Sequence, residues 1–209
     1  MGEVDERQAI AATHAAIDSG VTFIDTAEGY RTSEDVLGRA LEGRRDDVFL
    51  ATKLSGDHSV EHIRKALTNS LKGPSYRLRR SVPDPRPETG VAYRGHNGGT
   101  GVIAHSPLAK GLLTGKYSAG HEFPEGDERH DHPYYGGSVM STAFAVADRL
   151  RNWASDHGRS LADLAIAWTL GHPAVTSSIV GAKTPEQARM NAAAGDWELD
   201  QNDMSEIDR

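Results

Sequence analysis

Two apolar segments that each run into a charged residue constrain this chain most strongly. Residues 21–26 have the pattern of a buried strand that contains Asp25, and residues 48–52 that of a second strand followed by Lys53. A helical segment from Ser33 to about residue 43 separates them. This strand–helix alternation is typical of a parallel sheet with helices packed outside it. We therefore expect the carboxylate and the ammonium at neighbouring strand ends.

Helix signals surround these two strands. Apolar residues at helical spacing and capping residues predict helices over residues 5–19, from Ser33 to about residue 43, and over residues 59–72. Asp5 is expected to cap the first helix with Gln8 completing a capping box, and Ser59 to cap the third. The third helix should bury a stripe of Ile63, Ala66, Leu67, Ser70 and Leu71. A strand–helix domain of this kind would continue with further repeats.

The alternation breaks between residues 73 and 100. This segment contains four prolines, five glycines and five arginines, and it has no apolar run long enough for a buried strand. We expect an irregular connection within a single domain that covers residues 1–209. An anion-binding arm is the alternative reading of its arginines.

Periodic segments return after residue 100. We predict strands at 102–104 and 175–180, helices at 138–157 and from Ser160, and a helix from Thr184 with Pro185 at its first position. Ser160 with Asp163, and Thr184 with Gln187, are expected to form capping boxes. The helix at 138–157 should bury Val139, Ala143, Val146, Leu150 and Trp153. Residues 118–137 are expected to form a mobile loop, and a short polar helix should follow Asp200.

Composition excludes several classes of protein. The net charge of −7 provides no basic field for nucleic acid or an anionic membrane surface. The absence of cysteine removes disulfides, cysteine nucleophiles and thiolate-bound zinc. The acidic start of the chain lacks an apolar signal segment, and no apolar run approaches membrane-spanning length. We expect a cytoplasmic protein.

Asp25, Tyr30 and Lys53 together form a candidate acid–base site. An ammonium close to a phenol stabilises the phenolate, and a carboxylate can hold the ammonium in place. Tyr30 could then give its proton to a carbonyl oxygen. The alternative is an ordinary ion pair beside a surface tyrosine.

Longer motifs extend this reading. Residues 23–30, Phe-Ile-Asp-Thr-Ala-Glu-Gly-Tyr, together with residues 33–41 and 47–53, closely resemble the signature of the aldo-keto reductases. Residues 102–117 and 179–191 resemble that family's two cofactor loops. The similarity covers nearly all of residues 5–72 and 101–209, with several motifs in the family's order.

The resemblance implies a (β/α)8 TIM barrel that reduces small aldehydes or ketones with NADP(H). Asp25, Tyr30 and Lys53 would be catalytic, with Tyr30 as the general acid. The cofactor's pyrophosphate would lie along Ser106, Leu108, Gly111 and Leu112. Its adenosine end would be held by Gly181, Lys183, Gln187 and Asn191, where the lysine supplies charge for a 2′-phosphate and the following helix offers free N–H groups.

Departures from the family pattern predict an incomplete barrel. Ser81 stands where the family has its fourth catalytic residue, a histidine, and the strand leading into it is degraded. The first, fifth and sixth strands have no counterpart, and the chain is shorter than the roughly 250 residues of a typical barrel. Weaker cofactor binding, impaired catalysis and self-association through exposed sheet edges are the expected consequences.

Two alternative functions remain open. One is a non-catalytic remnant or nucleotide-binding module of the same family, and the other is an unrelated phosphate-binding α/β enzyme. The histidines of the 118–137 loop, His121, His130 and His132, lack the defined spacing of a metal site, so no metal is expected.

Overall fold

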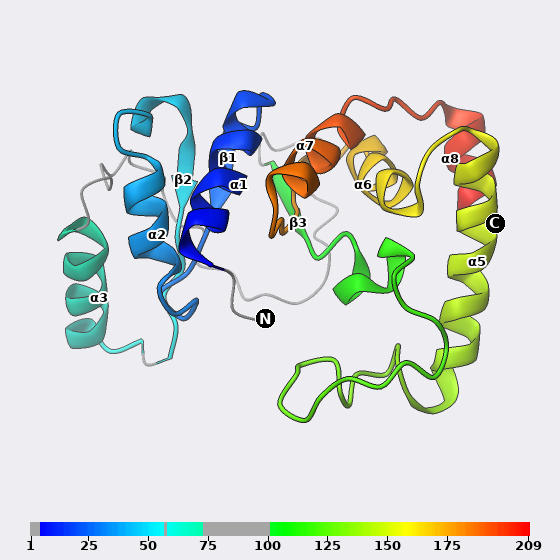
Figure 1. The fold of residues 1–209 in the computed structure, drawn as a ribbon, viewed down its shortest axis with the longest axis horizontal. Helices are drawn as coiled ribbons and strands as arrows, with labels where there is room; N and C mark the ends of the chain where they lie inside the picture. Colours follow the sequence, from blue (N-terminus) through cyan, green and yellow to red (C-terminus); the bar gives the residue numbers. More distant parts are fainter. Residues whose placement is uncertain (1–4, 57, 73–100) are drawn as a thin grey trace. The chain divides into compact units, whose positions relative to one another are not determined.

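The computed structural model describes residues 5–56, 58–72 and 101–209. These residues fall into two compact units (Figure 1). The N-terminal unit comprises the described residues up to 72 together with 182–189, and the C-terminal unit comprises 101–181 and 190–209. The predicted irregular segment at 73–100, Ser81 included, lies outside the described residues.

The N-terminal unit contains two strand–helix repeats preceded by a helix. Its elements are α1 (Glu6–Asp18), β1 (Phe23–Asp25), α2 (Ser33–Ala40), the 3-10 turn η1 (Arg45–Asp47), β2 (Phe49–Ala51) and α3 (Val60–Lys72). Strands β1 and β2 are parallel, with Phe23 opposite Phe49 and Asp25 opposite Ala51. The predicted order of strands and helices in this part of the chain is therefore confirmed.

Small residues let α1 and α2 pack closely. Ala12 and Ala15 of α1 are buried, as are Leu37 and Ala40 of α2 and Leu41 just after it. Alanine side chains let the two backbones approach, so that the His14 ring nitrogen Nε2 lies 2.8 Å from the Ala40 carbonyl oxygen. This small core holds the helices that follow and precede β1.

Capping was predicted correctly at two helices of this unit and wrongly at one. Asp5 accepts from the Gln8 N–H, although the Gln8 side chain does not complete the predicted capping box, and Ser59 accepts from the His62 N–H. Ser33 is the first residue of α2 rather than its cap, and Thr32 occupies the cap position without a side-chain bond. The Ser33 hydroxyl instead accepts a bond of 2.9 Å from Thr26, which is fully buried at the end of β1.

Helix α3 is attached by polar contacts more than by its apolar stripe. Ala66 and Ser70 are buried, but Ile63 and Leu67 are exposed by 36% and 43%. The Ser70 hydroxyl donates to the Glu34 carboxylate of α2 at 3.0 Å, and Figure 1 shows α3 beside α2. The predicted burial of Ile63 and Leu67 is thus wrong among the described residues, because they cover no other element.

The C-terminal unit contains a second parallel pair of strands with helices around it. Its elements are β3 (Val102–His105), the 3-10 turns η2 (Ala109–Thr114) and η3 (Gly137–Val139), α5 (Met140–Asp156), α6 (Leu161–Gly171), β4 (Val175–Ile179) and α8 (Gln201–Ile207). Helix α7 (Pro185–Ala194) begins in the segment grouped with the N-terminal unit. Strand β3 pairs with β4, with an irregularity after Val102. All four predicted strands are present, each within two residues of its expected ends.

The core of this unit includes residues of the loop after β3. Leu112, Phe123, Tyr135, Phe144, Ala147 and Leu161 form one buried cluster. Helix α5 buries Phe144, Ala147 and Ala154, whereas Val139 and Val146, predicted to be buried, are 45% and 41% exposed. Ala143 and Leu150 of the predicted stripe do pack against this core, partly buried, so the prediction was wrong at Val139 and Val146.

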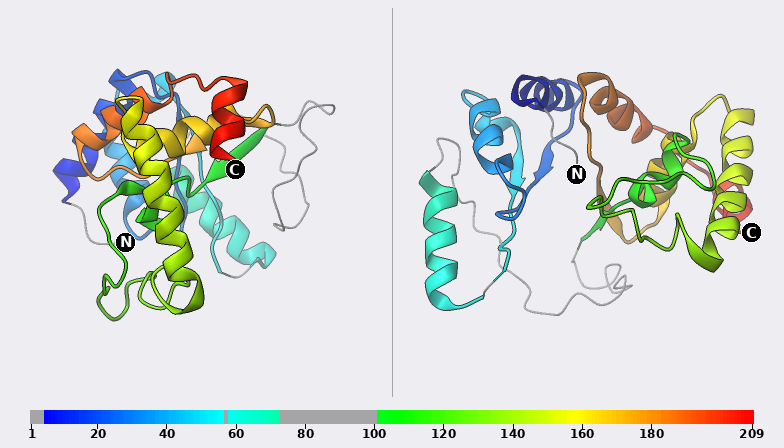
Figure 2. Two further views of the ribbon diagram at one scale, coloured as in Figure 1. Left: turned by 90° about the vertical axis from the view of Figure 1, so that its right-hand side faces the viewer. Right: turned by 60° about the horizontal axis from the view of Figure 1, so that its bottom comes forward.

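Hydrogen bonds from two tryptophan indoles attach the C-terminal helix α8 to α5 and α6. The Trp153 N–H donates to Glu206 at 3.0 Å, and the Trp168 N–H donates to Asp208 at 3.0 Å. Figures 1 and 2 show α8 lying beside α5, as the first bond requires. Capping boxes start α6 at Ser160 and α8 at Asp200, the first of them as predicted. In the part of the chain that the structure describes, no helix has the length and hydropathy needed to cross a membrane.

Candidate active site

The ends of β1 and β2 bring Asp25 and Lys53 together. Pairing continues past the strands, since the Thr26 N–H donates to the Ala51 carbonyl at 2.9 Å and the Glu28 N–H to the Lys53 carbonyl at 3.0 Å. The Lys53 ammonium consequently forms an ion pair with Asp25 and donates to the Thr26 carbonyl at 2.9 Å. The Asp25 side chain is 16% exposed and that of Lys53 44%, so the ammonium is held but open to solvent.

Tyr30 lies on the turn after β1. Its N–H donates to the Ala27 carbonyl, its carbonyl accepts from Ser33, and Arg31 has a left-handed φ of 53°. The Lys53 ammonium lies 5.2 Å from the centre of the Tyr30 ring, a cation–π arrangement. Tyr30 is 45% exposed, and its phenol oxygen makes no hydrogen bond to any residue that the structure describes. The structure therefore brings the three predicted residues together and leaves the phenol available to a ligand.

Sequence reasoning missed the residues that hold the Tyr30 turn. The Glu28 carboxylate accepts from the Ser55 N–H at 3.2 Å and lies 3.1 Å from His62 Nε2. The Gly29 N–H donates to the Ser55 hydroxyl at 3.0 Å. The bond from Ser55 lowers the pKa of Glu28 below its ordinary value, and His62 adds to this effect. The parallel pairing of β1 and β2, which the sequence predicts, implies that the loops after these strands lie side by side.

The loop after β3 has an unusual backbone. Ser106, Ala109 and Lys110 have positive φ angles of 56°, 45° and 53°, and Gly111 has 101°. Such angles are uncommon outside glycine, and they cluster at ligand-binding segments. The turn is closed by the Ala109 N–H to the Ser106 carbonyl at 2.9 Å and the Gly111 N–H to the Leu108 carbonyl at 2.8 Å.

The four predicted pyrophosphate residues are not equivalent in this loop. Ser106 is exposed, and Leu108 and Gly111 are half-buried. Leu112 is only 6% exposed because its side chain belongs to the core of the C-terminal unit. Any contact of Leu112 with a ligand would therefore be made by its backbone.

The segment 118–137, expected to be a mobile loop, includes side chains that pack around one arginine. The Arg129 guanidinium lies 4.2 Å from the centre of the Phe123 ring and donates to Tyr117 at 2.9 Å. It also holds the Asp127 carboxylate, which lowers the pKa of Asp127 well below its usual range. Within the described residues no three potential ligands meet at a metal site, and the His130 ring bonds the Phe123 carbonyl.

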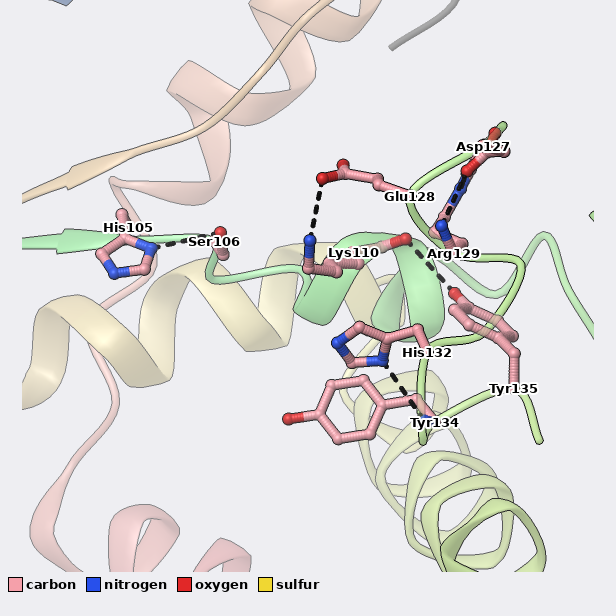
Figure 3. A network of polar contacts seen from close by, with 9 residues as sticks. All are labelled: His105, Ser106, Lys110, Asp127, Glu128, Arg129, His132, Tyr134 and Tyr135. Carbon is pink, nitrogen blue, oxygen red and sulfur yellow. Dashed lines mark hydrogen bonds and ion pairs between the residues drawn. The ribbon is translucent and has the colours of Figure 1, made fainter. Parts of the chain in front are cut away.

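Polar contacts connect this segment to the loop after β3. Figure 3 shows the Lys110 ammonium reaching Glu128 at 2.9 Å, and the Tyr135 hydroxyl donating to the Lys110 carbonyl at 3.3 Å. Both partners of Lys110 come from the 118–137 segment. The left-handed backbone at Lys110 is thus held from its side chain and from its carbonyl.

The segment from Gly181 to Asn191 forms a small closed loop at the start of α7. The Gln187 N–H donates to the Thr184 hydroxyl at 3.2 Å, so Thr184 caps the helix as predicted. The Gln187 side chain accepts from the Lys183 N–H at 2.8 Å rather than from Thr184, and the Asn191 side chain donates to the Gly181 carbonyl at 3.4 Å. The exposed Lys183 ammonium has no partner among the described residues.

Comparison with known proteins identifies the family. The sequence profile of the Aldo/keto reductase family matches residues 1–81 and 74–209. The chain therefore belongs to the aldo/keto reductase family.

Relatives match nearly the whole chain at modest identity. The chain is 25% identical to the aldo-keto reductase YhdN of Bacillus subtilis, with 99% of this chain and 84% of the relative covered. It is 27% identical to a probable voltage-gated potassium channel subunit beta of Oryza sativa subsp. japonica, with 93% and 84% covered. A part match of 36% identity, covering 58% of this chain and 35% of the relative, is with L-glyceraldehyde 3-phosphate reductase of Escherichia coli O157:H7.

Solved structures support the TIM-barrel fold class. The glycerol dehydrogenase AKR11B4 from Gluconobacter oxydans superposes with a TM-score of 0.80 at 21% identity, covering 100% of this chain and 86% of that chain. An aldo/keto reductase from Klebsiella pneumoniae, solved in complex with NADP and acetate, gives a TM-score of 0.65 at 24% identity, with 98% and 85% covered. The predicted family and the α/β fold class are therefore confirmed.

Proposed function

We propose that this chain is an NADP(H)-dependent oxidoreductase that reduces the carbonyl group of a small aldehyde or ketone. One observation carries the proposal most directly: Lys53 pairs with Asp25 and lies 5.2 Å from the ring of the solvent-accessible Tyr30. A phenol, an ammonium and a carboxylate in this arrangement can deliver a proton to a carbonyl oxygen.

The three residues have distinct roles in this reaction. A reduced nicotinamide cofactor, when bound, would supply the hydride for the carbonyl carbon. The phenol O–H of Tyr30 breaks as its proton passes to the carbonyl oxygen, which completes the alcohol. Lys53 stabilises the phenolate that remains, and Asp25 holds Lys53 at the strand end. Solvent returns a proton to Tyr30, which is 45% exposed.

Residues at two places in the chain fit a dinucleotide. The segment from Ser106 to Gly111, in which four residues have positive φ angles, would hold the pyrophosphate together with the backbone of Leu112, as such strained segments often do. The exposed Lys183 ammonium and the N-terminus of α7 would hold a 2′-phosphate. Gln187 and Asn191 would act by shaping the loop at Gly181, because their side chains already bond its backbone.

We further propose that the barrel is internally shortened. The match with the Bacillus relative extends over 283 positions, more than the 209 residues of this chain, and the family profile matches in two pieces that meet at residues 74–81. The first, fifth and sixth strands would be absent and the fourth degraded, with Ser81 in place of the family's histidine. Looser positioning of the reacting groups would then impair catalysis.

A non-catalytic nucleotide-binding protein is the second candidate. The Tyr30 hydroxyl makes no hydrogen bond to Lys53, so the proton path is not assembled without a ligand. One relative is named a probable potassium channel subunit rather than a reductase. In this reading the cofactor residues function and the catalytic residues do not.

NADPH titration followed by a turnover assay with an aromatic aldehyde tests both candidates. Reduction that disappears in Tyr30→Phe supports the enzyme, and binding without turnover supports the nucleotide-binding protein. Tyr134→Phe is the matched control, since Tyr134 is also exposed but lies outside the catalytic residues. A folded chain that binds no NADPH would refute both candidates.

The proposal includes a cytoplasmic location and self-association of the chain. A cytoplasmic protein is consistent with the acidic, cysteine-free sequence. Each sheet of the described residues has only two strands, and strand edges left uncovered would allow pairing between copies. Size-exclusion chromatography over a range of concentrations tests self-association, which a constant monomer mass would contradict.

A further inference from the structure

Glu28 occupies the junction between the two loops that carry the catalytic residues. Its backbone N–H donates to the Lys53 carbonyl at 3.0 Å, and its carboxylate accepts from the Ser55 N–H at 3.2 Å. Glu28 therefore joins the loop of Tyr30 to the loop of Lys53 through both its backbone and its side chain.

His62 connects this junction to α3. The ring Nε2 lies 3.1 Å from Glu28 Oε2, and because a carboxylate can only accept, Nε2 carries the proton. The side chains of His62 and Glu28 are 28% and 30% exposed. His62 lies in the first turn of α3, whose start is held by the Ser59 cap. The imidazole thus approaches the carboxylate from a defined helical position.

The contact between the loops is close at the residue before Tyr30. The Gly29 N–H donates to the Ser55 hydroxyl at 3.0 Å, and a Cβ at Gly29 would lie 2.7 Å from that oxygen. Only glycine allows this approach without displacing Ser55. A shift of Ser55 would therefore displace Gly29, and Gly29 is joined directly to Tyr30.

We propose that Glu28, Ser55 and His62 form a brace that positions the Tyr30 phenol beside the Lys53 ammonium. The brace rests on the proposed function, since positioning of Tyr30 matters to catalysis only if Tyr30 gives the proton. His62, Glu28 and Ser55 are positioning residues that act through Tyr30 and Lys53.

A purely structural role makes a different prediction. Helix α3 has a second polar attachment, in which Ser70 donates to Glu34 at 3.0 Å. If His62 acted only by attaching α3 to the rest of the unit, Ser70→Ala would lower kcat as much as His62→Ala does. The brace predicts that only the contact beside Tyr30 affects the reaction.

Steady-state kinetics of the full chain provide the first test. We expect His62→Ala to lower kcat for aldehyde reduction by about 10- to 100-fold, with the NADPH dissociation constant and the aldehyde KM within about twofold of the parent, because a misplacement near 1 Å can cost about 100-fold. His62→Gln should restore most of kcat, since its amide N–H can donate to Glu28. Glu28→Ala should match His62→Ala.

Two control variants complete the kinetic test. Ser70→Ala removes the other attachment of α3, and His58→Ala removes an exposed histidine just before the helix. Both should keep kcat within about twofold of the parent, because neither side chain has a hydrogen bond to the Tyr30 loop among the described residues. A loss in Ser70→Ala equal to that in His62→Ala, or no rescue by His62→Gln, would overturn the brace.

An NMR measurement tests the brace without requiring activity. The chain has six tyrosines, and in protein labelled with ¹³C in the tyrosine rings the Tyr30 signal is assigned by its absence in Tyr30→Phe. His62→Ala and Glu28→Ala should shift this signal and leave the other five unchanged, whereas Ser70→Ala should not. A Tyr30 signal that is unchanged in His62→Ala would refute the brace. Absence of turnover in the parent protein would instead refute the proposed function alone.

Discussion

The ammonium of Lys53 is paired with the carboxylate of Asp25, although 28 positions separate the two residues in the sequence. Parallel pairing of β1 and β2 produces this contact. Asp25 lies opposite Ala51, and the two segments remain paired beyond the ends of the strands. A bond from Lys53 to the Thr26 carbonyl fixes the ammonium from a second direction. The pair is therefore a property of strand register, and its main consequence should be catalytic.

Lys53→Met should separate catalysis from stability. Loss of the ammonium removes the cation that stabilises the Tyr30 phenolate, so kcat/KM should fall by about 100- to 10,000-fold. Unfolding free energy should change by less than about 1 kcal/mol, because the Lys53 side chain is 44% exposed and such ion pairs contribute little. Urea unfolding and aldehyde turnover measure the two effects. Arg64→Met, which removes an exposed cation of α3, is the control and should leave turnover unchanged.

Lys183→Met should weaken discrimination between the two nicotinamide cofactors. The exposed ammonium has no partner among the described residues, and a 2′-phosphate would supply one. We expect NADPH affinity to fall by about tenfold, equivalent to roughly 1.4 kcal/mol, and NADH affinity to change little. Fluorescence titration of both cofactors measures this, with Arg149→Met of α5 as a control for net charge. Equal losses for NADPH and NADH would contradict a contact with the 2′-phosphate.

Leu164→Ala should destabilise the C-terminal unit. Leu164 in α6 is 1% exposed, and truncating a buried leucine to alanine typically costs about 2–5 kcal/mol. Val146→Ala on the exposed face of α5 should cost less than about 1 kcal/mol, because its side chain is 41% exposed. Urea unfolding followed by tryptophan fluorescence reports on this unit, which contains Trp153, Trp168 and Trp197. Similar losses in both variants would show that the buried face of α5 or α6 is wrongly assigned.

Tyr135 should make the C-terminal unit sensitive to alkali. Burial raises the pKa of Tyr135 to about 12, although the Arg129 charge opposes the effect. Because the folded pKa lies above the unfolded value of about 10, the stability contributed by this phenol is complete below pH 10 and is lost as pH rises toward 12. Urea midpoints should therefore fall between about pH 10 and pH 12, with a smaller slope in Tyr135→Phe.

Absorbance at the phenolate band provides the direct check on Tyr135. One tyrosine should ionise later than the others in the parent protein, and this late step should be missing in Tyr135→Phe. Tyr134→Phe, the neighbouring exposed tyrosine, should retain it. A late step that persists without Tyr135 would contradict the assignment.

Local signals accounted for most elements. A helix cap depends only on one side chain and the N–H groups of the next turn, so sequence spacing is sufficient to find it. The caps at Ser59, Ser160 and Thr184 were found in this way. The same logic failed at Ser33, because the buried Thr26 hydroxyl donates to the Ser33 oxygen. A contact seven positions away replaced the local one.

Burial patterns were harder to predict than helix positions. In α5, alanines and apolar residues surround much of the helix, so sequence spacing alone permits several stripes, and packing against η2 and α6 selected the face with Phe144 and Ala147. In α3, the predicted stripe is correct in its spacing, but no described element covers Ile63 and Leu67. Periodicity identifies the side of a helix that could be buried, not what buries it.

The sequence by itself determined the family and the order of the described strands and helices, and it predicted Asp25, Tyr30 and Lys53 as the candidate site, because these are carried by local motifs and by strand ends. Only the tertiary structure decided that Lys53 lies against the ring of Tyr30, that Leu112 is a core residue, and that Glu28, Ser55 and His62 meet beside the Tyr30 turn. These contacts join residues from different strands, loops and helices. Their partners follow from register and packing, which local propensity does not encode.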